Sequence, residues 1–108
     1  MNIVPITPDY SVAPQIAPED VAEIAALGFR SIMCNRPDGE EPGQPTFATI
    51  DAAARAHDLV TANVPVISGH IGPDDVAEFR AAMAELPRPT LAYCRSGARC
   101  QHLWRLAL

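Results

Sequence analysis

Short apolar segments alternate with longer amphipathic segments along this 108-residue chain. The apolar segments have the length of strands, and they are residues 2–6, 10–13, 29–34, 60–67 and 90–93. The amphipathic segments repeat apolar residues at helical spacing, and they are residues 17–29, 46–59, 72–87 and 99–108. Alternating strands and helices require crossover connections that make neighbouring strands parallel. The sequence therefore predicts an α/β fold with a mostly parallel sheet flanked by helices.

Length and composition predict one domain over residues 1–108. The formal net charge of −5 argues against nucleic acid or an anionic membrane as partner, because both require a basic surface. No apolar run approaches the roughly 20 residues of a membrane span, and the N-terminal segment lacks the basic flank of a secretory signal. We therefore expect a cytoplasmic protein, whose oligomeric state the sequence leaves open.

The three cysteines are too few and odd in number for a disulfide framework, which favours free thiols. Neither a C-x-x-C pair nor a paired-histidine spacing is present, so no metal and no other cofactor is predicted. Chemistry is expected from the protein's own side chains.

Polar loops follow three of the predicted strands, and they read "CNRPDGE" (residues 34–40), "SGHIG" (68–72) and "CRSGAR" (94–99). In parallel sheets, ligands bind outside the carboxyl ends of the strands. The three loops are therefore predicted to form one site.

The segment "AYCRSGAR" places Cys94 between a strand and a helix. The backbone N–H groups of a curled loop and a helix N-terminus attract anions, and Gly97 allows the backbone to turn sharply. Arg99 adds a planar cation suited to a tetrahedral oxyanion, and Arg95 adds a second. A thiol in this setting is expected to have a pKa well below ~8.5 and to act as a nucleophile. Cys34, within an apolar strand, is interpreted as a packing residue.

Longer segments resemble the bacterial beta-lactamase-hydrolase-like, phosphatase-like domain, a family that also includes proteins described as sulfur transferases. The matching segments are "SVAPQIAPEDVAEIAALGFRSIMCNRPDGEEPGQP", "VPVISG" and "LAYCRSGARCQHLW". The resemblance implies a cysteine-phosphatase-like three-layer fold, with Cys94, Gly97 and Arg99 in an active-site loop. It also implies that a second polar loop lies beside the first, with Asn35, Arg36, Asp38 and Glu40. Because the family extends beyond the position of Leu108, the domain is expected to be short at its C-terminus.

Two features differ from cysteine phosphatases. Their loop has five residues between cysteine and arginine, whereas "CRSGAR" has four and is similar to the loop of rhodanese-type sulfurtransferases. Related phosphatases carry an aspartate general acid where this chain has Ser68 and Gly69, and general acid catalysis contributes typically 10²–10⁴-fold. Asp38 could replace that acid from the neighbouring loop.

We therefore predict a cysteine-thiolate enzyme, in the first place a sulfurtransferase that carries a persulfide on Cys94 between small donors and acceptors. The alternative is a phosphatase-like hydrolase that cleaves phosphomonoesters through a phosphocysteine. A second alternative is a non-catalytic anion- or redox-sensing module. The expected partner is a small anionic substrate, either a sulfane-sulfur donor or a phosphate ester. The candidate catalytic residues are Cys94, Arg99 and Asp38, the candidate anion-binding residues are Arg95, Ser96, Gly97, Ala98, Asn35 and Arg36, and the candidate redox partner is Cys100.

Overall fold

Five short strands form one sheet in the computed structural model, which describes residues 1–108. The order across the sheet is β1-β2-β5-β3-β4. β1 pairs with β2 antiparallel, and every other pairing is parallel. The prediction of a mostly parallel α/β sheet is confirmed. The strands are β1 (Val4–Thr7), β2 (Tyr10–Ala13), β3 (Ser31–Cys34), β4 (Val60–Asn63) and β5 (Thr90–Tyr93).

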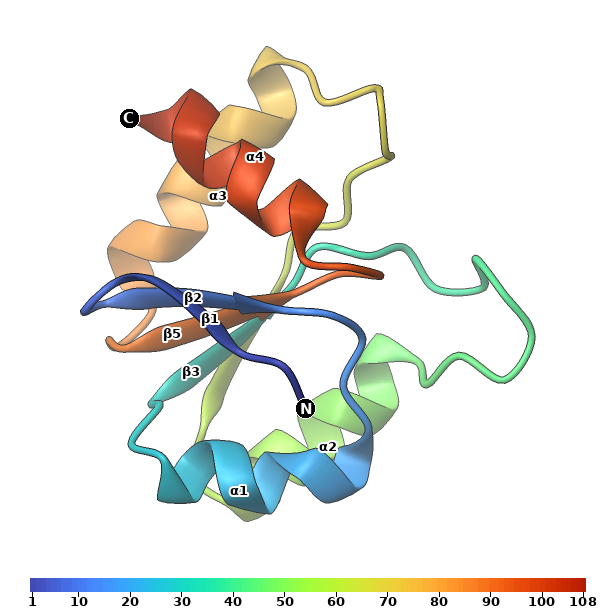
Figure 1. Ribbon diagram of the computed structural model, residues 1–108, viewed down its shortest axis with the longest axis vertical. Helices are drawn as coiled ribbons and strands as arrows, with labels where there is room; N and C mark the ends of the chain where they lie inside the picture. The colour runs from blue at the N-terminus through green and yellow to red at the C-terminus, as the bar shows by residue number, and fades with distance from the viewer.

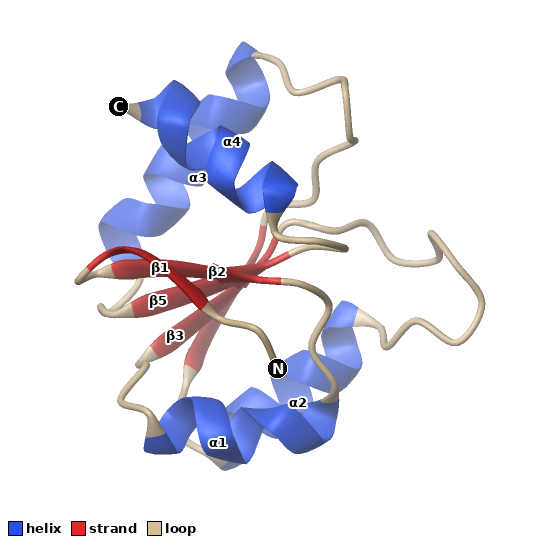
Figure 2. Cartoon of the chain, in the orientation of Figure 1, coloured by secondary structure: helices blue, strands red, loops and turns tan.

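Helices cover both faces of this sheet (Figure 1). α1 (Val21–Ala26), which follows a short 3₁₀ turn, and α2 (Phe47–Ala56) lie on one side. α3 (Pro73–Glu85) and α4 (Ala98–Ala107) lie on the other, which gives the three layers seen in Figure 2. The longest helix, α3, has 13 residues, and none of the helices reaches the length of a membrane span.

The central strands are buried on both faces, which explains why they appear in the sequence as continuous apolar runs. Successive residues of β3 and β5 point to opposite layers. One layer contains Met33 and Ala92 with Phe79 of α3 and Leu103 of α4, and the other contains Ile32 and Leu91 with Ile24 of α1 and Ile50 of α2.

Tyr10 attaches α4 to the sheet. Its hydroxyl donates a hydrogen bond to the carbonyl oxygen of Cys100 at 2.8 Å. Its ring stacks on Trp104, with the ring centroids 4.6 Å apart. These contacts hold α4 against the strands, so that the start of this helix lies beside the end of β5.

The strand predicted over residues 60–67 is shorter in the structure, where β4 ends at Asn63. Pro65 has no N–H group to donate to the neighbouring strand. The N–H groups of Val64 and Val66 still bond to the carbonyls of Cys34 and Asn35, at 2.9 and 3.2 Å. The segment after β4 is therefore fixed beside the loop after β3, although it is not regular strand.

Candidate active site

The cysteine loop connects β5 to α4 at the carboxyl edge of the sheet. Cys94 follows the last residue of β5 and is fully buried. Gly97 has φ +94°, a left-handed conformation that favours glycine, and α4 begins at the next residue. The loop therefore turns sharply over the sulfur and aims the first N–H groups of α4 toward it.

Backbone and side-chain donors stabilise Cys94 as a thiolate. The thiol of Cys100 donates a hydrogen bond to Cys94 and is the largest cause that lowers its pKa, to about 5. Backbone N–H groups of Ser96, Arg99 and Cys100 lower the pKa further, and the N–H of Gly97 lies 3.0 Å from Sγ. Burial opposes this effect. Burial also raises the pKa of Cys100, which therefore remains a protonated donor at neutral pH.

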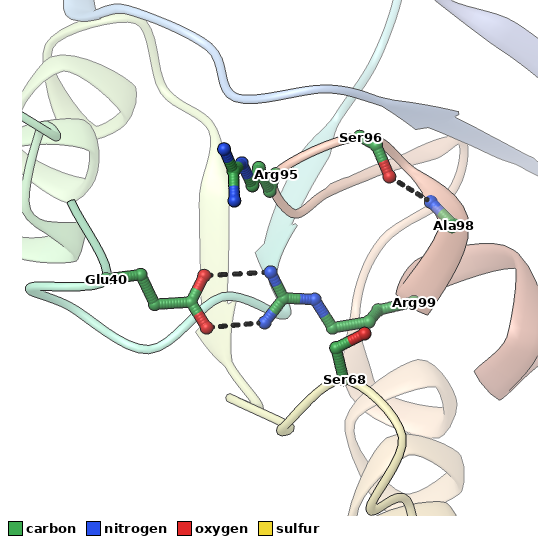
Figure 3. Close-up of a pocket in the computed structure, with 6 residues that line it drawn as sticks. All are labelled: Glu40, Ser68, Arg95, Ser96, Ala98 and Arg99. Carbon is green, nitrogen blue, oxygen red and sulfur yellow. Dashed lines mark hydrogen bonds and ion pairs between the residues drawn. The ribbon is translucent and has the colours of Figure 1, made fainter.

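A polar pocket of about 380 Å³ opens above the loop (Figure 3). All three polar loops contribute to it, because its lining combines the loop after β3, the segment after β4 and the cysteine loop. The sulfur of Cys94 is not part of the lining and lies beneath the loop. The lining residues are Glu40, Ser68, Arg95, Ser96, Ala98 and Arg99.

Arg99 is fixed in this pocket by a carboxylate (Figure 3). Its Nη1 and Nη2 donate to the two carboxylate oxygens of Glu40, each at 2.8 Å, and Nη1 also donates to the carbonyl of Val66 at 3.0 Å. A guanidinium has five N–H groups, so the Nε–H and one Nη2–H remain. Hydrogen bonds to Glu40 raise the pKa of the Arg99 guanidinium, and the nearby Cys94 raises it further.

Arg36 does not line the pocket, contrary to its predicted role as a direct anion ligand. Its side chain is buried, and its three nitrogens donate to Glu40, Gln15 and Glu41 at 2.8–3.0 Å. Arg99 first, and Arg36 after it, lower the pKa of Glu40 to about 2. The carboxylate of Glu40 is therefore ionised at neutral pH and cannot serve as a proton donor.

Asn35 and Asp38 also lie outside the pocket lining. The side-chain amide of Asn35 is buried and donates to the carbonyl of Val64 at 2.9 Å. The carboxylate of Asp38 accepts the backbone N–H of Phe47 at 2.9 Å, at the start of α2. Unpaired N–H groups at a helix N-terminus attract carboxylates, which accounts for this position.

Sequence reasoning placed Glu40 and Ser68 in loops of the site but assigned neither of these lining residues a role. A signal for Glu40 was present, because the family resemblance placed it in the polar loop beside the cysteine loop. Ser68 had no signal of its own beyond its place in a polar loop.

The chain matches the family described as "Beta-lactamase hydrolase-like protein, phosphatase-like domain" over residues 2–108. It is 37% identical over 107 residues to a beta-lactamase hydrolase-like protein of Xylella fastidiosa, covering 99% of this chain and 25% of that protein. The chain thus spans about a quarter of the length of the curated relatives it matches.

Among solved structures, a candidate phosphatase of Neisseria meningitidis Z2491 is similar with a TM-score of 0.89 and 38% identity, covering 96% of this chain and 74% of that one. The core catalytic domain of the PP-IP phosphatase SIW14 of S. cerevisiae shares the fold alone, with a TM-score of 0.68 and 15% identity over 90% of this chain and 57% of that one. The three-layer, cysteine-phosphatase-like fold is confirmed.

The comparisons support the phosphatase-like alternative and do not support the sulfurtransferase that the sequence predicted first. They agree with the expectation of a phosphatase-like domain. The chain belongs to the phosphatase-like domain family of beta-lactamase hydrolase-like proteins.

Proposed function

We propose that this domain is a cysteine-dependent phosphatase-like hydrolase that acts on small phosphate monoesters. The observation that carries the proposal is a buried sulfur with a pKa of about 5 beneath a pocket that contains two arginines. The thiolate of Cys94 attacks phosphorus, and the bond to the leaving oxygen breaks with its electron pair. Water then cleaves the phosphorus–sulfur bond, which releases phosphate and restores the thiolate. Arg99 and the loop N–H groups neutralise the phosphoryl oxygens during both steps.

The charges of the pocket restrict the leaving group. The carboxylate of Glu40 is ion-paired with two arginines, and that of Asp38 is bonded to the start of α2. Neither carboxyl group is therefore available to protonate an alkoxide as it departs. The substrates that suit this pocket are phosphate esters whose leaving group is a stable anion, such as an aryl phosphate.

The same charges favour a second candidate, sulfur transfer. The Cys94 thiolate would attack the sulfane sulfur of thiosulfate, and the sulfur–sulfur bond would break with release of sulfite. Cyanide would then take that sulfur as thiocyanate and restore the thiolate. Neither step protonates a leaving group, and the loop has four residues between Cys94 and Arg99, as in rhodanese-type sulfurtransferases.

One experiment separates these functions. The wild-type protein and Cys94→Ser are assayed on p-nitrophenyl phosphate and, separately, on thiosulfate with cyanide. The phosphatase proposal predicts nitrophenol release that falls at least ~10³-fold in Cys94→Ser, because the serine hydroxyl is not ionised at neutral pH. Thiocyanate formation without nitrophenol release would replace it with sulfur transfer, and inactivity in both assays would favour a non-catalytic sensing module.

A further inference from the structure

One carboxylate joins two arginines that come from different parts of the chain. Arg36 Nε and Arg99 Nη2 both donate to Oε1 of Glu40 at 2.8 Å, and Arg99 Nη1 donates to Oε2 at 2.8 Å. Only 1% of the Arg36 side chain is exposed, whereas Arg99 lines the pocket. Glu40 thus connects a guanidinium anchored in the interior to the guanidinium that faces the substrate.

The position of Glu40 is unexpected on electrostatic grounds. Its carboxylate is part of the pocket lining, so its negative charge repels any anion that enters the pocket. A pocket that only attracted anions would have a neutral residue there. Glu40 must therefore bring a gain that offsets this repulsion, and its contacts indicate that the gain is the orientation of Arg99. A free arginine side chain loses rotamer entropy when it is ordered, and a side chain that is already fixed avoids this loss on binding.

We propose that Glu40, anchored by Arg36, is a positioning residue that fixes the Arg99 guanidinium and leaves its Nε edge to bind the substrate anion. The end of the guanidinium is occupied by Glu40 and by the carbonyl of Val66. The Nε–H and the second Nη2–H form a parallel pair of donors that matches two oxygens of a tetrahedral anion. This inference deepens the proposed function and rests on it, since both concern the same pocket.

The proposal can be tested by whether phosphate binds more weakly or more tightly when Glu40 is replaced. Inorganic phosphate is titrated by calorimetry into the Cys94→Ser protein, with and without Glu40→Gln, so that turnover plays no part. If Glu40 positions Arg99, the Glu40→Gln variant binds phosphate about tenfold more weakly, although a negative charge has been removed. If Glu40 only repels anions, the same variant binds phosphate more tightly.

Glu41→Gln in the same Cys94→Ser protein is the matched control. Glu41 carries the same charge one residue further along and does not line the pocket. It contacts Arg36 at 3.0 Å and the exposed Arg95 at 3.9 Å, but not Arg99. Its removal is expected to leave phosphate affinity unchanged or up to about twofold tighter. A similar loss in both variants would mean that general damage to the loop is responsible, and would overturn the specific role of Glu40.

A third variant keeps the test decisive if Glu40→Gln does not fold. Glu40→Asp retains the charge and shortens the side chain by one carbon, so positioning predicts weaker binding while simple repulsion predicts no change. Unchanged or tighter phosphate binding in the folded Glu40 variants would overturn the inference. Absence of phosphate binding in the Cys94→Ser parent would instead overturn the proposed function, and the inference with it.

Discussion

Cys34 and Cys94 are two buried thiols at the carboxyl ends of adjacent parallel strands, and their pKa values move in opposite directions. Their exposed fractions are 2% and 0%, and β3 pairs with β5 so that Cys34 lies opposite Tyr93. Burial raises the pKa of the Cys34 thiol, which donates to the carbonyl of Arg36 at 3.2 Å. The pKa of Cys94 is lowered to about 5.

The difference between the two thiols arises from the chain that follows each strand. After Cys34 the chain continues through a long loop, and the next helix, α2, does not begin until Phe47. After Cys94 the chain turns at Gly97 and α4 begins at Ala98, so N–H donors surround the sulfur. Burial alone makes a thiol unreactive, and the same burial combined with a helix start makes it a stable thiolate.

The largest expected effect is the difference between the pKa values of the Cys94 and Cys34 thiols. Thiolate absorbance near 240 nm should show one midpoint at about pH 5 that is lost in Cys94→Ser, since that thiol is the one with a lowered pKa. Cys34→Ala should leave this midpoint in place, because the pKa of the Cys34 thiol is raised. An optical titration is preferable to alkylation here, because it reports the ionisation of a thiol directly and both thiols are buried.

The comparison of the two thiols would fail if the low midpoint persisted in Cys94→Ser. It would also fail if the wild-type protein showed no thiolate below pH 8. Either result would mean that the N–H groups of the cysteine loop do not stabilise a negative charge on Cys94.

The cysteine loop could be predicted because its parts are contiguous. Strand, cysteine, glycine, arginine and helix follow one another between Thr90 and Ala107, and local geometry then places the N–H groups around the sulfur. The same reasoning correctly predicted that the chain would build one pocket from three loops.

The contacts that complete the pocket could not be predicted in this way. Glu40 and Arg99 are 59 residues apart, and their pairing depends on the path of a long loop that no periodic pattern describes. Asp38 was the loop carboxylate that the sequence analysis chose as a candidate catalytic residue, but its carboxylate binds the start of α2 instead. Arg36 lies in a loop beside the site, as expected, but its side chain is buried and does not line the pocket.

A smaller effect is expected from the neighbouring thiol of Cys100. Cys100→Ala removes the hydrogen bond that is the largest cause of the low pKa, so the Cys94 midpoint should rise by about one pH unit. Cys100→Ser retains a donor and should leave the midpoint closer to that of the wild-type protein. The measurement is the same absorbance titration in both variants. Equal midpoints in the alanine and serine variants would mean that the thiol packs against Cys94 without donating to it.

The smallest effect is expected from alanine substitutions at one glycine in each of the two loops. Gly97 has φ +94° and Gly39, in the loop after Cys34, has φ +77°. A Cβ at Gly97 would meet the backbone of Ala13 at 3.5 Å, an ordinary contact, and one at Gly39 would meet nothing within 4 Å. Alanine at either position should therefore cost about 1–2 kcal/mol of stability in urea unfolding, through strain at positive φ. The two variants should differ in the pKa of the Cys94 thiol. The N–H of Gly97 lies 3.0 Å from Sγ of Cys94, and relief of the strain in Gly97→Ala turns this N–H away. The pKa of Cys94 is therefore expected to rise in that variant. Gly39→Ala should leave that pKa unchanged, and an equal rise in both variants would show that the Cys94 pKa depends on overall stability rather than on the turn at Gly97.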